Sequence, residues 1–157
     1  MICDECQALY EEVGDRVRKP DVFEKVRRTD ERLICKAKGI EAEAYYSVEI
    51  PDAHDRVGIA LQTLDRWLSE SIEAELMFQG EKIEDLLEEE LADHGLERRL
   101  DVQHFRDEQK RYTFRSEIAV PVEEVLDGPE MIDRVTRALL AYEATFRELG
   151  DMKPTES

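Results

Sequence analysis

The sequence predicts a single α+β domain in which an antiparallel sheet of about five strands is packed with helices in two layers. Three observations lead to this fold class. Stretches with a hydrophobic period of two are interspersed with stretches of period 3.6, the strand-like stretches come in consecutive runs, and the first and last helical stretches each carry one apolar stripe. The expected order is α-βββ-α-α-ββ-α. The domain is expected to span residues 1–150, with residues 151–157 as a flexible C-terminal tail.

The first helix is expected over residues 2–18. Its apolar residues recur at steps of three and four, which is the pattern of one buried helix face: Ile2, Cys6, Leu9, Val13 and Val17. Pro20 cannot continue the helix. The charged stretch 21–32 that follows admits a short helical turn.

Residues 33–50 change to a period of two, with a turn at Gly39, and therefore predict a β-hairpin. A second turn follows at Pro51 and contains His54. Alternation resumes at residues 57–61, so that a third strand continues the meander.

Two helical segments come next. Thr63 is a plausible N-cap for a helix that reaches Gly80, with Trp67 and an apolar stripe formed by Leu64, Leu68, Ile72 and Leu76. Residues 81–94 form a second, acidic helix, which we expect to lie outside the main hydrophobic core because few of its residues are apolar: Ile83, Leu86, Leu87 and Leu91.

A second hairpin and a closing helix complete the chain. Residues 98–104 and 112–120 alternate on either side of a polar turn at 107–110, and His104 is expected to be partly buried and hydrogen-bonded. Pro129 suits the first turn of the last helix. That helix has the most regular stripe in the chain: Ile132, Val135, Leu139, Tyr142, Phe146 and Leu149.

This order of elements, together with the closing stretch FRDEQKRYTFRSEIAVPVEEVLDGPEMIDRVTRALLAYEATF, resembles the YbjN and type III secretion chaperone-like superfamily. The resemblance spans roughly residues 2–149 and rests on a hairpin-then-helix pattern. It implies a small, acidic, typically dimeric protein that binds without catalysis. Members that serve secretion hold an extended partner chain against apolar grooves. The acidic helix at 81–94 departs from the shortest members.

Charge excludes several classes of partner. With 39 acidic and 22 basic residues the formal charge is −17, which repels nucleic acid and anionic membrane surfaces. The N-terminal residues carry acids where a signal peptide carries Lys or Arg, so a cytoplasmic location is expected. The three cysteines are accordingly expected to be reduced.

Few residues suggest chemistry. Cys3 and Cys6 have the CxxC spacing of a redox pair or of half a zinc site, but no second pair accompanies them, and structural thiols are favoured over metal or redox roles. Glu90 and His94 lie four residues apart, which alone does not make a metal site. No nucleotide-binding or nucleophile motif is present. We therefore expect no catalytic residues, no metal and no cofactor.

The function expected is that of a non-catalytic, chaperone- or adaptor-like protein-binding module, with a small metal-dependent or hydrolytic enzyme as the alternative. The partner is expected to be another protein or a second copy in a homodimer. The residues proposed for a partner or dimer surface are Tyr45, Trp67, Met77, Phe78 and Phe105. The competing interpretations place Tyr45 and Phe105 beneath a helix, and the Trp67 helix between the sheet and the acidic helix.

Overall fold

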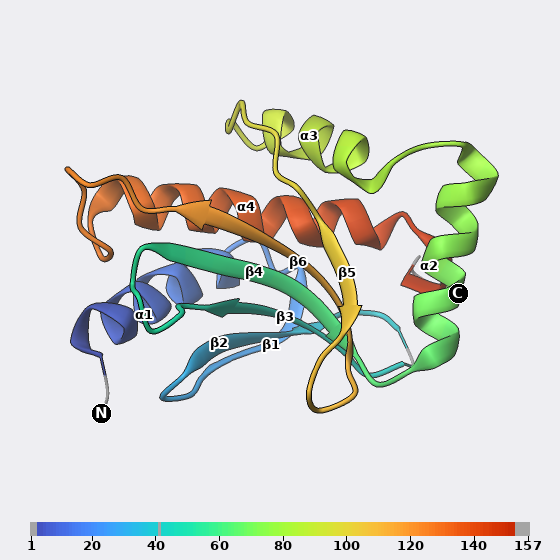
Figure 1. Cartoon of the computed structure of the whole chain (residues 1–157). Helices are drawn as coiled ribbons and strands as arrows, with labels where there is room; N and C mark the ends of the chain where they lie inside the picture. Colours follow the sequence, from blue (N-terminus) through green and yellow to red (C-terminus); the bar gives the residue numbers. More distant parts are fainter. Residues whose placement is uncertain (1–2, 41, 153–157) are drawn as a thin grey trace.

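The computed structural model describes residues 3–40 and 42–152. A six-stranded antiparallel sheet has the order β1-β2-β3-β4-β6-β5 and is accompanied by four α-helices and a short 3-10 helix, which confirms the α+β fold class (Figure 1). The elements are α1 (Asp4–Arg18), β1 (Phe23–Arg28), β2 (Arg32–Ala37), β3 (Ala44–Glu49), β4 (Arg56–Thr63), α2 (Arg66–Gln79), α3 (Ile83–Asp93), β5 (Gln103–Arg106), β6 (Tyr112–Ala119), α4 (Pro129–Arg147) and η1 (Gly150–Met152).

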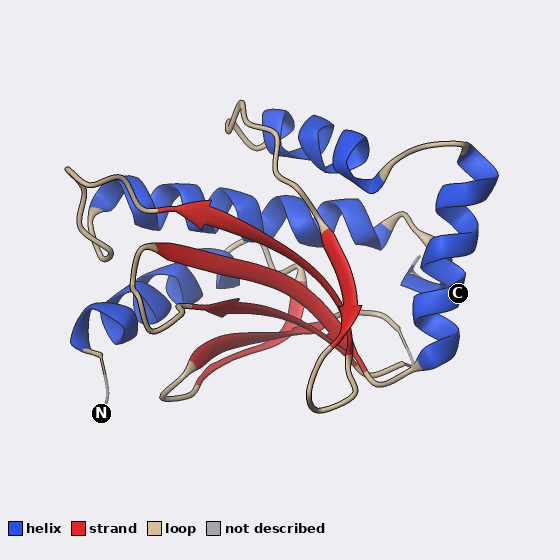
Figure 2. Ribbon diagram, in the orientation of Figure 1, coloured by secondary structure: helices blue, strands red, loops and turns tan. Residues whose placement is uncertain are grey.

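Helices α1 and α4 contact each other and cover one face of the sheet. The core lies between these layers, where alternate strand residues meet the helix stripes. Tyr142 of α4 lies within 2.5 Å of the Ser116 hydroxyl on β6, so the hydroxyls of both buried side chains are paired. Helix α3 packs on α4, and α2 stands at one end of the sheet against η1 (Figure 2).

The expectation of a helical turn within residues 21–32 is wrong, because β1 forms there as an additional edge strand. Its pairing with β2 shifts register between Phe23 and Lys25. This irregularity separates the inward residues Phe23 and Val26 by three positions, whereas a regular strand would separate them by two. The alternation that signals a strand is therefore hidden in the sequence.

Thr63 is not the N-cap of α2. The Asp65 side chain accepts the backbone N–H of Leu68 at 3.1 Å and caps the helix. The Thr63 hydroxyl instead donates to the carbonyl of Glu43 at 2.7 Å, because Thr63 is still the last residue of β4. Gly80 ends α2 in the left-handed conformation that glycine adopts without strain.

The second hairpin is shorter than its alternating pattern predicts, because strand pairing of β5 begins only at Gln103. Leu100 is buried although it precedes the strand. Apolar residues can alternate with polar ones in an irregular segment when other parts of the fold bury them, so this alternation does not require a strand.

The acidic helix and the first C-terminal residues also differ from expectation. Leu87 and Leu91 of α3 are fully buried in the core, so this helix belongs to the core through one narrow stripe. Asp151 and Met152 form part of η1, and Met152 is buried, so they are not a flexible tail. The rest of the expected tail, 153–157, and Ile2 of the expected first helix stripe lie outside the described residues.

Within residues 3–40 and 42–152, no helix has both the length and the apolar character needed to cross a membrane.

Candidate functional site

No helix described in the structure lies over the sheet face opposite α1 and α4 (Figure 2). Residues that pair across neighbouring strands point to the same face, so the register defines the side chains of this open face. One row across all six strands consists of Lys25, Lys36, Tyr45, Gln62, Thr113 and Phe105, and the next row consists of Arg27, Ile34, Ser47, Ala60, Arg115 and Gln103.

The middle of the open face is hollowed. Ser47, Ala60 and Thr113 are at most 5% exposed although no helix covers them, because they are small and larger side chains stand around them. The Arg115 guanidinium lies across Gly58, where a Cβ atom would come within 2.3 Å of it. Small residues therefore line the floor around Ser47, Ala60 and Thr113, while the Arg115 side chain covers Gly58.

Three hollows of about 200, 280 and 270 Å³ occupy this face. The first and second share Ser47, Gln62 and Arg111 in their linings. The first and third share Arg27, Ile34 and Tyr45. The three hollows are therefore neighbours and follow one another across the strands from β1 toward β5; together we call them the sheet groove.

Gln62 ties the floor of the sheet groove together. Its amide oxygen accepts from Arg32 Nη1 at 3.2 Å and from the Ser47 hydroxyl at 3.4 Å. Its amide nitrogen donates to Asp107 Oδ2 at 3.3 Å and to the Thr113 hydroxyl at 3.4 Å. The four bonds reach Arg32, Ser47, Asp107 and Thr113, so this network holds β2, β3, β6 and the β5–β6 turn in place around Gln62.

Basic side chains form the rim of the sheet groove. They are Lys25, Arg27, Arg32, Lys36, Arg111 and Arg115, and we call them the basic rim. Lys36, Arg111 and Arg115 pair with carboxylates. Among the described residues, Lys25, Arg27 and Arg32 form no ion pair at salt-bridge distance. Carboxylates also line the hollows, at Glu43, Glu49, Asp107 and Glu108, so the sheet groove carries charges of both signs, with three cations left without a salt bridge among the described residues.

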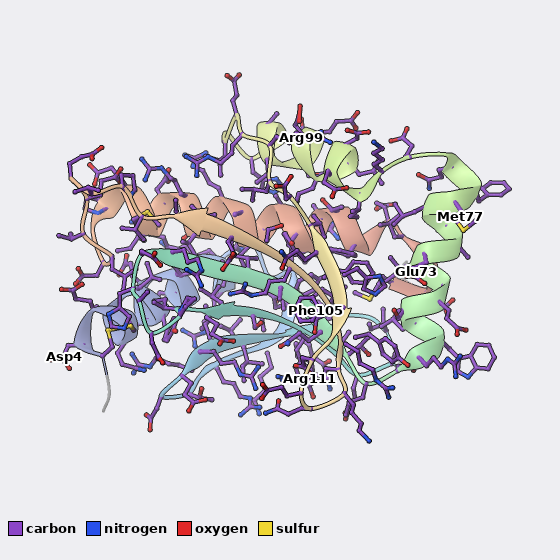
Figure 3. The ribbon with its side chains drawn as sticks, viewed as in Figure 1. Asp4, Glu73, Met77, Arg99, Phe105 and Arg111 are labelled. Atoms are coloured by element: carbon purple, nitrogen blue, oxygen red, sulfur yellow. A yellow bond between two sulfur atoms is a disulfide. The ribbon has the colours of Figure 1, made fainter. Side chains whose placement is uncertain are left out.

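The β5–β6 turn, which carries Arg111 (Figure 3), makes one wall of the sheet groove. Asp107 holds this turn closed. Its carboxylate accepts the backbone N–H groups of Gln109 and Arg111 and the Nε–H of Arg111 at 2.8 to 3.0 Å. Burial alone would raise the pKa of Asp107. The bonds from Arg111 and Gln109 and the Arg111 charge outweigh burial, so the pKa lies below its usual value and the carboxylate stays ionised.

Tyr45 and Phe105 both lie on the open face, in the same cross-strand row. Tyr45 lines the sheet groove and is half-buried, while Phe105 is 39% exposed at the wall (Figure 3). The interpretation that they lie beneath a helix is wrong, because the helices cover the opposite face. The two residues share the open face, but β4 and β6 lie between them.

Trp67, Met77 and Phe78 lie apart from the sheet groove on α2 and are 76%, 83% and 88% exposed. The opposite side of α2 faces β5, where Glu73 lies 2.8 Å from His104 Nδ1 (Figure 3). The interpretation that α2 is sandwiched between the sheet and the acidic helix is wrong, since α3 packs on α4. We call the three exposed residues the α2 stripe.

The two histidine candidates differ in their contacts. His104 stacks on Phe114 and contacts Ser69 and Glu73, which confirms a hydrogen-bonded histidine; its side chain is 29% exposed, while the residue as a whole is exposed on β5. His94 Nδ1 lies 2.8 Å from the backbone oxygen of Glu90, a contact that does not involve the Glu90 carboxylate.

The cysteines differ from expectation. Cys3 and Cys6 form a disulfide, so the expectation of reduced thiols is wrong for this pair. Cys35 is a free thiol in the core, and burial raises its pKa to about 12. This thiol is therefore inert at neutral pH.

The basic rim was missed by our sequence reasoning, although a signal for part of it exists. Lys25 and Arg27, and likewise Arg32 and Lys36, have the even spacing of residues that share one strand face. Because β1 was not recognised as a strand, these four cations could not be assigned to a common surface.

No family model matches the chain, and no curated protein or solved structure matches it.

Proposed function

We propose that the protein is a non-catalytic binding module whose sheet groove holds an extended, acidic segment of a partner protein. The observation that carries this proposal is the sheet groove itself: a hollow of small residues that crosses the sheet, is bounded by the basic rim and has no helix over it. Pockets of this kind, with a few fixed polar groups at their base, are typical binding sites.

An extended segment suits the floor of the sheet groove. Its side chains are short, so a polypeptide backbone can approach closely, and the hydroxyls of Ser47 and Thr113 lie along it. Tyr45 and Phe105 supply flat apolar area at two separated points, where side chains of the segment can pack. The groove thus offers both hydrogen bonds and anchors.

An acidic segment suits the rim. Arginine binds carboxylates through two parallel N–H groups, and Arg27 and Arg32 are not occupied by carboxylates of the described chain. The strongly acidic remainder of the surface repels anionic partners, so an acidic segment is attracted only where the basic rim dominates the local field. Binding should weaken as salt is added.

The Asp107 carboxylate of the sheet groove supports binding over catalysis. Burial raises its pKa, but the hydrogen bonds and charge of Arg111 outweigh burial and the pKa is lowered; beside the groove, Arg115 and Arg56 lower the pKa of Glu117 in the same way. Carboxylates held ionised by arginines are poor general acids and weak bases near neutral pH. The alternative, a small hydrolytic enzyme, has no comparable support at this site.

The resemblance to the YbjN and type III secretion chaperone-like superfamily stays a prediction, and the proposal does not depend on it. It is compatible with a groove that holds a partner chain. A cytoplasmic location likewise remains part of the proposal.

Site-specific photo-crosslinking tests the proposed function. A benzophenone amino acid replaces Tyr45 in the sheet groove or, as the control, Glu89 on the exposed side of α3. In native lysate, the groove position should yield a discrete crosslinked product that disappears when Arg27→Glu and Arg32→Glu are added. Equal products from both positions, no product at position 45, or a product indifferent to the charge reversals would contradict the proposal.

We also propose that the α2 stripe is a homodimer contact, because its three side chains present apolar area that the fold does not bury. Trp67 is the sole tryptophan, so its fluorescence reports this contact directly. Sedimentation equilibrium at micromolar concentration should give a dimer, with emission shifting to shorter wavelength as dimer forms. Met77→Lys should abolish both effects. A mass near 18.3 kDa throughout would exclude the dimer.

A further inference from the structure

The two cysteines at the start of α1 lie beside a histidine from a distant loop. His54 Nδ1 is 3.9 Å from Cys3 Sγ, and His54 Nε2 is 3.9 Å from Cys6 Sγ. The ligand atoms of the three residues all lie within 4.8 Å of one another. Nothing in the sheet groove or the α2 stripe involves this cluster.

We propose that Cys3, Cys6 and His54 form a zinc site in the reduced protein, and that the Cys3–Cys6 disulfide is the oxidised, metal-free state of the same site. Two thiolates and one imidazole are ligands that zinc prefers, and the CxxC spacing on a helix start is common in zinc sites. Our sequence reasoning disfavoured metal because a further ligand was missing. The fold supplies it from residue 54.

The distances fit zinc. With Zn–S of about 2.3 Å and Zn–N of about 2.05 Å, a tetrahedral ion places sulfur and nitrogen about 3.6 Å apart and two sulfurs about 3.8 Å apart. Only one ring nitrogen of His54 can bind the ion; it lies 3.9 Å from one sulfur and at most 4.8 Å from the other. One sulfur to nitrogen distance therefore needs to shorten by a few tenths of an ångström and the other by up to about 1.2 Å. The sulfurs separate when their bond is reduced, while a Cα–Cα distance of 5.1 Å leaves both side chains facing the same point.

The local structure holds the three residues in place. Cys3 is the N-cap of α1, and its sulfur accepts the backbone N–H of Cys6 at 3.2 Å. His54 adopts a φ of +56°, a conformation that is uncommon for a residue with a side chain, in a turn closed by its N–H bond to the Pro51 carbonyl.

The site is open to solvent on one side. Cys6 is buried, Cys3 is half-buried and His54 is exposed. Three protein ligands leave the fourth position of a tetrahedral ion for water, so the metal can enter and leave from the surface. Two thiolates also neutralise the double charge of the ion, which gives a site without net charge.

The two states are connected by a balanced reaction. Two molecules of a small thiol reduce the disulfide, forming their own disulfide and leaving Cys3 and Cys6 as thiols. Zinc then binds as both thiols release their protons and His54 donates a neutral ring nitrogen. Oxidation of the two thiolates reverses these steps and expels the metal. Zinc occupancy is therefore coupled to the thiol redox state.

Metal analysis of the full chain tests this proposal. Protein without a histidine tag is reduced with a phosphine, supplied with zinc, dialysed and analysed for bound metal, and its affinity is measured by competition with a chromogenic chelator. One zinc per chain is expected after reduction and none after oxidation. Cobalt in place of zinc should show the absorption bands of tetrahedral thiolate coordination.

Variants that preserve the fold make the test specific. Cys3→Ser keeps an oxygen at the N-cap, and His54→Asn keeps a residue that tolerates positive φ. Each substitution should weaken zinc affinity at least about tenfold, because even replacing a residue that only hydrogen-bonds to a metal ligand has an effect of this size. Cys35→Ala removes the buried thiol and should leave zinc unchanged. Absence of stoichiometric zinc after reduction, or full zinc affinity in Cys3→Ser and His54→Asn, would overturn the proposal.

Discussion

The two faces of the sheet are built from the same strands but carry opposite chemistry. On the covered face β1, β2, β3, β4 and β6 contribute apolar side chains to the core beneath α1 and α4, whereas β5 contributes none. On the open face most of the alternate residues are small, polar or charged, with Tyr45 and Phe105 among them, and the centre is buried without a covering helix. The comparison teaches that the core on the covered face can supply the stability of the fold. The side chains of the open face are then not needed for the core and can serve binding.

Adjacent tyrosines on β3 give the largest expected contrast. Tyr46 is 1% exposed on the covered face and lies near Phe23, whereas Tyr45 stands on the open face. Tyr46→Ala should lower the free energy of unfolding by about 3–5 kcal/mol because it empties a core position. Tyr45→Ala should lower it by less than about 1 kcal/mol. Urea unfolding measures both free energies. Equal losses in the two variants would show that the two faces do not differ in their contribution to stability.

Asp107 is the residue of the open face that we expect to matter most for stability. Asp107→Asn removes a charge that accepts four hydrogen bonds, from Gln62, Gln109 and twice from Arg111, and should destabilise the protein by about 1–3 kcal/mol. The folded-state pKa of Asp107 lies below its unfolded value. Its contribution is therefore complete above the unfolded pKa and disappears as pH falls through the folded one.

The pH dependence can be isolated by comparing the two proteins. The stability difference between wild type and Asp107→Asn should be constant near neutral pH and shrink below the usual range of carboxylate titration. A difference that grew on acidification would mean that the Asp107 carboxylate is not stabilised by Arg111.

The smallest effect is expected outside both faces. Glu88 and Glu89 lie on the exposed side of α3, and within residues 3–40 and 42–152 Glu88 pairs with the exposed Arg99 alone. Replacing both with Ala should change stability by no more than about 0.5 kcal/mol. A loss above about 2 kcal/mol in thermal or urea unfolding would show that the acidic side of α3 helps to hold the fold.

Local patterns accounted for most of the fold and for little of the candidate site. The stripe of α4 and the alternation of β3 and β4 are regular, so the fold class and these elements followed from periodicity. Strand β1 did not, since its bulge moved Phe23 and Val26 out of phase. Residues 98–102 alternate without forming a strand, because Leu100 is buried by tertiary contacts.

The candidate site was harder to foresee because it depends on contacts between distant segments. The basic rim combines Arg27, Arg32 and Arg111, which only the sheet register and the β5–β6 turn bring to one face. His54 reaches Cys3 and Cys6 across about fifty residues of sequence, as their separations of 51 and 48 show. Exposure of the α2 stripe likewise depends on α3 packing on α4 instead of on α2.

The most direct test of the central claim is a nuclear magnetic resonance titration of the isotope-labelled protein with a glutamate-rich peptide that contains one aromatic residue. The account predicts amide shifts at the floor and walls of the sheet groove, at Ser47, Gly58, Ala60, Gln62 and Thr113, which weaken with added salt and vanish in Arg27→Glu/Arg32→Glu. It predicts no shifts on the covered face or on α3. Shifts centred elsewhere, or a bound state that survives the charge reversals, would contradict the claim that the open face is the binding face.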